Sequence, residues 1–133
     1  MSRSLIQVTN QSTQTVADNS IITLGSVQRR FGCNCKLSGN AIEVLGEGYY
    51  TVDATVSVAP TTAGDVEVAI YNNGVPLTGA VAYGTVATGG TVTLPIVATL
   101  RQGCCCASAD TLTLVLIEGG GTVTNVSIRV EKV

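Results

Sequence analysis

The chain of 133 residues contains no histidine and no tryptophan, and it has a single phenylalanine. Without histidine it has no Ser-His or Cys-His nucleophile system, and it lacks the commonest general base of enzymes. Its carboxylates are spread over separate segments, and Gly119-Gly120-Gly121 is followed by neither a lysine nor a helical pattern that could hold a phosphate. We therefore expect a protein that is not an enzyme and that uses no cofactor.

Charge is scarce as well: charged residues make up only 12% of the chain, and the formal net charge is -2. The seven lysines and arginines are scattered, which leaves no electrostatic footprint for nucleic acid. Much of the surface must then consist of Thr, Ser, Asn, Gly and aliphatic side chains, which suits a subunit of an assembly better than a free monomer. We expect an oligomer that does not bind nucleic acid.

Long hydrophobic runs are absent too. No stretch approaches the roughly 20 apolar residues that a membrane-spanning helix needs. The first residues, MSRSLIQVTNQST, lack the apolar core of a secretory signal peptide. These two absences predict a chain that is made in the cytoplasm and does not insert into a membrane.

The sequence does contain a regular alternation of apolar and polar residues. Its clearest stretch has one apolar face, formed by Tyr50, Val52, Ala54, Val56 and Val58. The same period of two recurs around residues 66–70, 92–100, 112–116 and 126–130. Val97, Val115 and Ile117 make the second face of two of these segments apolar as well, which indicates a subunit interface or a second packed sheet.

Turn signals separate these segments, and Asn73-Gly74 is the strongest hairpin signal among them. No window combines a helical period with helix caps, so we expect almost no helix. About eight to ten short antiparallel strands need two packed sheets to hide one face each. The sequence therefore predicts an all-β jelly-roll β-sandwich over residues 25–133.

Residues 1–24 are more polar, and we expect an N-terminal arm or first strand there that anchors the subunit.

Three motifs follow one another in the second part of the chain: Gly-Tyr-Tyr-x-Val at Gly48–Val52, a strand ending in Tyr71-Asn72-Asn73-Gly74-Val75-Pro76, and a leucine-rich strand at Leu112–Leu116 before a last aliphatic strand. This order resembles the jelly roll shared by the complement first-component q subunit and tumour necrosis factor. The resemblance covers about two thirds of the chain. It implies a homotrimer around a three-fold axis lined by apolar and aromatic side chains, a closed symmetry that homo-oligomers favour.

On this resemblance Tyr49, Tyr71 and Tyr83 are candidates for the trimer interface. Each of them could equally be an ordinary half-buried aromatic residue of a sheet.

The segments 24–56 and 72–82 are also similar to short proteins of this type from phages and genomes of Gram-positive gut bacteria. This resemblance implies a trimeric virion component, such as a head fibre or a capsid decoration protein. Its partners would be its own copies, the capsid or particle surface reached through the N-terminal segment, and a host glycan or receptor that contacts exposed loops.

Five cysteines form two clusters, Cys33-Asn34-Cys35 and Cys104-Cys105-Cys106. In extended strands Cys33 and Cys35 would point to one side, and Cys104 and Cys106 would likewise share a side. A disulfide within the chain or between subunits could then join one residue of each pair. The alternatives are a site of four thiolates, for which C-x-C and three adjacent cysteines match zinc spacing poorly, and reduced thiols that act as small apolar side chains.

Two other classes of function stay open. One is a spore or cell-surface assembly protein whose cysteines crosslink its subunits. It resembles the jelly-roll subunits of spore appendages, but those carry their linking cysteines on an N-terminal extension, and residues 1–32 contain none. The other is a cytokine-like or lectin-like binding module.

Overall fold

The computed structural model describes residues 4–87, 89–103 and 110–133 and consists of β-strands joined by turns and loops. The strands are β1 (Leu5–Asn10), β2 (Gln14–Val16), β3 (Ser20–Ile21), β4 (Ser26–Phe31), β5 (Cys35–Ser38), β6 (Ala41–Val44), β7 (Gly48–Pro60), β8 (Gly64–Asn72), β9 (Val75–Val86), β10 (Val92–Gln102), β11 (Asp110–Glu118) and β12 (Gly121–Lys132). In the described part of the chain there is no helix, and therefore none that is long and apolar enough to cross a membrane.

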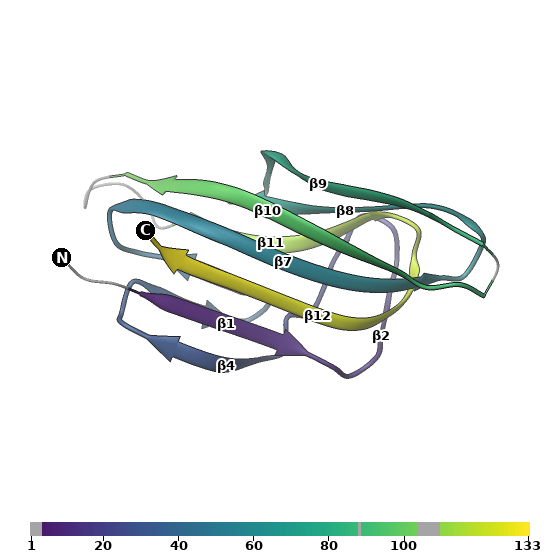
Figure 1. Cartoon of the computed structure of the whole chain (residues 1–133), viewed down its shortest axis with the longest axis horizontal. Helices are drawn as coiled ribbons and strands as arrows, with labels where there is room; N and C mark the ends of the chain where they lie inside the picture. The colour runs from purple at the N-terminus through teal and green to yellow at the C-terminus, as the bar shows by residue number, and fades with distance from the viewer. Residues whose placement is uncertain (1–3, 88, 104–109) are drawn as a thin grey trace.

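The strands form two antiparallel sheets that pack face to face (Figure 1). The first sheet has the order β10-β7-β12-β1-β4, and β2 also pairs with β12. The second sheet has the order β5-β6-β11-β8-β9, and β3 also pairs with β11. Each sheet buries one face because its apolar residues alternate with polar ones. The predicted all-β class and the two-sheet sandwich are confirmed.

The alternation predicted between Tyr50 and Val58 is present in β7. Its five apolar side chains are at most 3% exposed, and Thr51, Asp53, Thr55 and Ser57 lie on the opposite, half-buried face. β7 is hydrogen-bonded on both sides, to β10 and to β12. It is therefore a central strand, and its buried face lies in the middle of the core.

The first 24 residues contribute strands to both sheets. β1 lies between β12 and β4 in the first sheet, and β3 pairs with β11 in the second. The apolar side chains of this segment belong to the shared core: Ile6, Val8, Val16, Ile22 and Leu24. An anchoring role for the segment stays a prediction.

The hairpin between β8 and β9 has the turn that its sequence predicts. Asn72 pairs with Val75, and the two residues between them have positive φ angles, 54° at Asn73 and 82° at Gly74. A two-residue turn with both φ angles positive is of type I′, for which Asn-Gly is the preferred sequence. Asn73 also bonds to β11, because its backbone N–H donates to the carbonyl oxygen of Thr111 at 2.8 Å.

The segments that are apolar on both faces have different environments. Val115 is only 7% exposed, and its neighbours across the strands are Ala69 of β8 and Ile21 of β3. Val97 of β10 is 69% exposed, on the outer face of the first sheet. Within the described chain, packing of one strand on another therefore covers Val115 but leaves Val97 uncovered.

Tyr50 supplies a test of the core. Its ring is fully buried, and its hydroxyl donates a hydrogen bond to the Gly46 carbonyl oxygen at 2.7 Å. The substitution Tyr50→Phe should lower the free energy of unfolding by about 1–2 kcal/mol, because it leaves that carbonyl without its donor. Denaturant unfolding measures this loss.

The neighbouring tyrosine is the matched control. The Tyr49 ring is 55% exposed, so Tyr49→Phe should change the free energy of unfolding by no more than about 0.5 kcal/mol. Equal losses for the two variants would contradict the placement of Tyr50.

Candidate functional site

The outer face of the first sheet is a continuous surface built by five neighbouring strands. Across the order β10-β7-β12-β1-β4, one row of neighbouring residues reads Val97, Asp53, Arg129, Gln7 and Arg29. The adjacent row consists of Pro95, Thr55, Ser127, Thr9 and Ser26. This face is therefore polar at its centre, apolar at the β10 edge and basic at the β4 edge.

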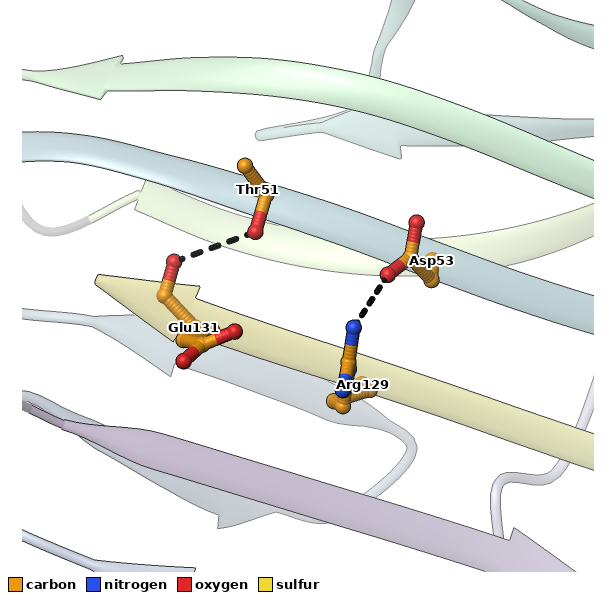
Figure 2. Close-up of polar contacts among 4 residues, drawn as sticks. All are labelled: Thr51, Asp53, Arg129 and Glu131. Carbon is orange, nitrogen blue, oxygen red and sulfur yellow. Dashed lines mark hydrogen bonds and ion pairs between the residues drawn. The ribbon is translucent and has the colours of Figure 1, made fainter. Parts of the chain in front are cut away.

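An ion pair neutralises the centre of this face. A terminal guanidinium nitrogen of Arg129, on β12, lies 2.8 Å from a carboxylate oxygen of Asp53 on β7 (Figure 2). The hydrogen bond and the charge of Asp53 raise the pKa of Arg129. Both side chains are more than 40% exposed, so the pair sets the local charge more than it stabilises the fold.

A shallow hollow of about 450 Å³ lies beside this pair, over β1, β4 and β12. Its lining is polar throughout: Gln7, Thr9, Gln11, Gln28, Arg29, Asn125 and Ser127. We call it the polar hollow. The lining contains no carboxylate and no apolar side chain.

Two β-bulges form the rims of the polar hollow. The register of β1 and β4 shifts between Gln7 and Val8, which inserts Gln28 beside Arg29. The register of β12 and β7 shifts between Val123 and Asn125, which inserts Thr124. A bulge turns consecutive side chains toward one face, where regular alternation would send them to opposite faces.

The polar hollow was not predicted from the sequence. One of its bulges has a signal in the sequence, because Val123 and Val126 are both buried although they are three residues apart. A strand without a bulge buries every second residue, so a spacing of three indicates an inserted residue. The other bulge lies in β4, whose six residues are all exposed, and an exposed strand has no apolar pattern from which a shift could be detected.

The opposite edge of the sandwich is apolar. β9 and β10 lie against each other there, each at the end of its own sheet (Figure 1). They approach closely because Gly84 has no side chain: a Cβ there would lie 2.9 Å from a methyl carbon of Val92. Tyr83 is 71% exposed and Val97 is 69% exposed. Tyr83 lies on the outer face of the second sheet, whereas Pro95 and Val97 lie on the outer face of the first sheet. We call the two edge strands, with these three exposed residues, the apolar edge.

The three candidate tyrosines do not form one patch. Tyr71 and Tyr83 lie on the outer face of the second sheet, where they pair with Thr113 and Glu67. Tyr49 lies at the end of β7 in the first sheet, with the guanidinium carbon of Arg101 at 5.7 Å from its ring centroid. Their role in a trimer interface stays a prediction, and Tyr83 is the one of the three on the apolar edge.

The cysteines of the first cluster have different environments. Cys33 is exposed in the turn before β5, whereas Cys35 begins β5 and is 1% exposed. They do not share a face as we predicted, because residues 32–34 form a bend and the chain is not extended between the two cysteines. Cys104 and Cys106 lie outside the described residues, so their crosslink stays a prediction. In the described part of the chain both thiols are free, and no group of three or more potential metal ligands occurs.

The fold has close counterparts among solved structures. Murine APRIL has a TM-score of 0.78 at 10% identity, over 99% of this chain and all of that one. The globular domain of zebrafish complement 1qA has a TM-score of 0.74 at 10% identity, over 99% of this chain and 97% of that one. The PRD1 vertex protein P5 has a TM-score of 0.70 at 14% identity, over 98% and 96%.

The chain is a jelly roll. The predicted fold is thereby confirmed, because these similarities extend over nearly the whole chain. At 10–14% identity they establish the fold alone. No protein-family model and no curated protein matches the sequence.

Burial of two acidic groups predicts how stability depends on pH. Burial raises the pKa of the Cys35 thiol from 9.0 to about 11 and that of the Tyr50 hydroxyl from 10.0 to about 12. Between about pH 9 and pH 12 the unfolded chain loses these protons while the folded chain keeps them. The free energy of unfolding should therefore fall as the pH rises through this range, by up to about 5 kcal/mol in total.

Urea unfolding at pH 8 and pH 10.5, in the presence of reductant, measures this dependence. Cys35→Ala should make the fall between the two pH values smaller, whereas Cys33→Ser, at an exposed site, should leave it unchanged. An identical pH dependence in wild type and Cys35→Ala would show that the buried thiol is not involved.

Proposed function

We propose that this chain is a non-enzymatic structural subunit that assembles into a homotrimer on the surface of a virion or a similar particle. The observation that carries this proposal is the apolar edge. β9 contains no charged residue, and the only charged residue of β10 is Arg101 near its end. Charged side chains are one common protection of edge strands, and exposed apolar side chains on strands with few charges are typical of a surface that another chain covers.

Self-association would cover this edge in a way that fits closed symmetry. The edge cannot pair with itself in a trimer, so each copy must place it against a different surface of the next copy. A stable interface of this kind buries about 1,200–2,000 Å² in total. Tyr83 and Val97 are its natural anchors, because exposed aromatic and aliphatic side chains gain most from burial.

One end of the sandwich supports an attachment role. β1 begins where β12 ends, because Leu5 pairs with Glu131. The exposed side chains of Phe31, Leu45, Tyr49 and Val133 lie at this end. We propose that this end, with the N-terminal segment, contacts the carrier particle. The loops at the other end, which include residues 61–63 and 119–120, would then face outward.

The particle surface is favoured by one of the fold's counterparts, since the PRD1 vertex protein P5 has the same architecture. A jelly roll supplies a rigid body whose loops can vary without disturbing the core. No chemical step is required of such a subunit.

A second candidate function rests on Cys33. Its thiol is exposed at the same end as Phe31 and Leu45. A spore or cell-surface assembly protein could use this thiol to crosslink its subunits, and its assemblies would then depend on disulfides rather than on the apolar edge.

Two substitutions test the apolar edge without weakening the fold. Val97→Lys places an ammonium group beside Asp53, and Tyr83→Lys places one beside Glu67. Both pairings are neutral or favourable in an isolated subunit. In an interface the lysine ammonium would lose its water, and the neighbouring carboxylate would offset only part of that desolvation cost, so the trimer should dissociate to monomers. Size-exclusion chromatography with light scattering measures the mass, and circular dichroism confirms the fold.

Ser26→Lys is the matched control, because Ser26 is exposed on β4 at the opposite edge of the first sheet and lies in the same outer row as Pro95. It should leave the trimer intact. A wild-type monomer, or trimers that survive both edge substitutions, would contradict the proposal. A larger assembly that collapses only with reductant would favour the crosslinked surface protein.

A further inference from the structure

The side chains of the polar hollow have few partners within the protein. Among the described residues, six of the seven lining side chains make no hydrogen bond: Gln7, Thr9, Gln11, Gln28, Asn125 and Ser127. The Arg29 guanidinium donates one bond, to the Gln28 backbone oxygen at 2.9 Å. A concave surface therefore presents a dense set of free donors and acceptors.

The charge of the hollow is also unbalanced. Arg129 lies next to Gln7 across the strands, but its charge is matched by Asp53. Arg29 belongs to neither of the two ion pairs found in the described part of the chain. With no carboxylate in its lining, the hollow carries one unmatched positive charge on its β4 rim.

The two bulges show that this chemistry depends on a local departure from regular strand geometry. Without the shift in β4, Gln28 and Arg29 would point to opposite faces of the sheet. Without the shift in β12, the same would hold for Thr124 and Asn125. Bulges often occur next to functional sites, where they redirect side chains.

We propose that the polar hollow binds a carboxylate-bearing sugar, such as a uronic or sialic acid. The planar guanidinium of Arg29 can bind a carboxylate through two parallel hydrogen bonds. The amides of Gln7, Gln28 and Asn125 each supply both donors and acceptors, which is what sugar hydroxyls require. The volume of about 450 Å³ lies within the usual range of small-ligand sites.

Other classes of ligand fit less well. An apolar ligand would find no apolar side chain in the lining, and a phosphate-rich polymer would meet a single unpaired cation. The exposed β8–β9 turn is a poorer sugar site, because the Asn73 amide already bonds to Asp110 and to the Thr111 N–H.

The proposal does not require the trimer, although three copies of a weak site would gain avidity on a glycan-coated surface.

The probes are N-acetylneuraminic acid, glucuronic acid and, as a neutral control, glucose. Titrations followed by amide chemical shifts of the labelled full chain should show saturable shifts at Gln7, Thr9, Arg29 and Ser127 for at least one acidic sugar. Glucose should bind about tenfold more weakly or worse, because it lacks the carboxylate.

Arg29→Gln should weaken binding of the acidic sugar about tenfold or more. The matched control is Arg101→Gln, which removes the same charge from the far edge of the same sheet and should bind like wild type. The mass of every variant is measured by light scattering.

Three results would overturn the proposal: no saturable shift with either acidic sugar, equal losses in the two arginine variants, or shifts that map away from the hollow. A change of assembly mass in Arg29→Gln alone would also overturn it, because the hollow would then be a contact between copies. The trimer proposal is tested separately by the edge variants, so either proposal can fail alone.

Discussion

Burial of one face of β7 and β12 is the constraint on which the rest of the structure depends. The two strands pair over most of their lengths. Together they place a set of branched aliphatic side chains against the second sheet: Val52, Val56, Val58, Val123, Val126, Ile128 and Val130. Since successive side chains alternate, a shift by one residue would expose this whole set. The register of the first sheet, and with it the outer face, is therefore determined by what must be buried.

The outer surfaces follow from this inner packing, but the two edges of the first sheet differ in charge and in exposure. At the β9 and β10 edge, Gly84 lets the two sheets come together, and β9 has no charged side chain while β10 has only Arg101 near its end. At the β4 edge, all residues are exposed and two arginines occur in succession. The first edge is suited to burial by another chain and the second to contact with water or polar ligands. An asymmetric subunit of this kind can assemble through one side while its other side stays accessible.

The bulges connect stability with surface chemistry. The bulge at Thr124 and Asn125 lets β12 bury both Val123 and Val126 although they are three residues apart. The same inserted residue brings another polar side chain to the outer face. Core packing on one side of the strand and hydrogen-bonding groups on the other are thus set by a single irregularity, so a substitution that removes the bulge would affect both.

The sequence by itself determined the all-β class, the buried face of β7 and the Asn73-Gly74 hairpin, because alternation and turn preference are local properties of a few consecutive residues. It did not reveal the polar hollow, whose residues come from three strands and from Gln11 just after β1, and these are brought together only by long-range pairing. The sequence also did not predict the different burial of Cys33 and Cys35, since a bend at residues 32–34 replaces the extended geometry on which the same-face inference relied. The tertiary structure also decided which apolar residues stay exposed. Val115 and Val97 lie in similar sequence patterns, but β11 is a central strand of its sheet and β10 is an edge strand, so only Val97 stays uncovered.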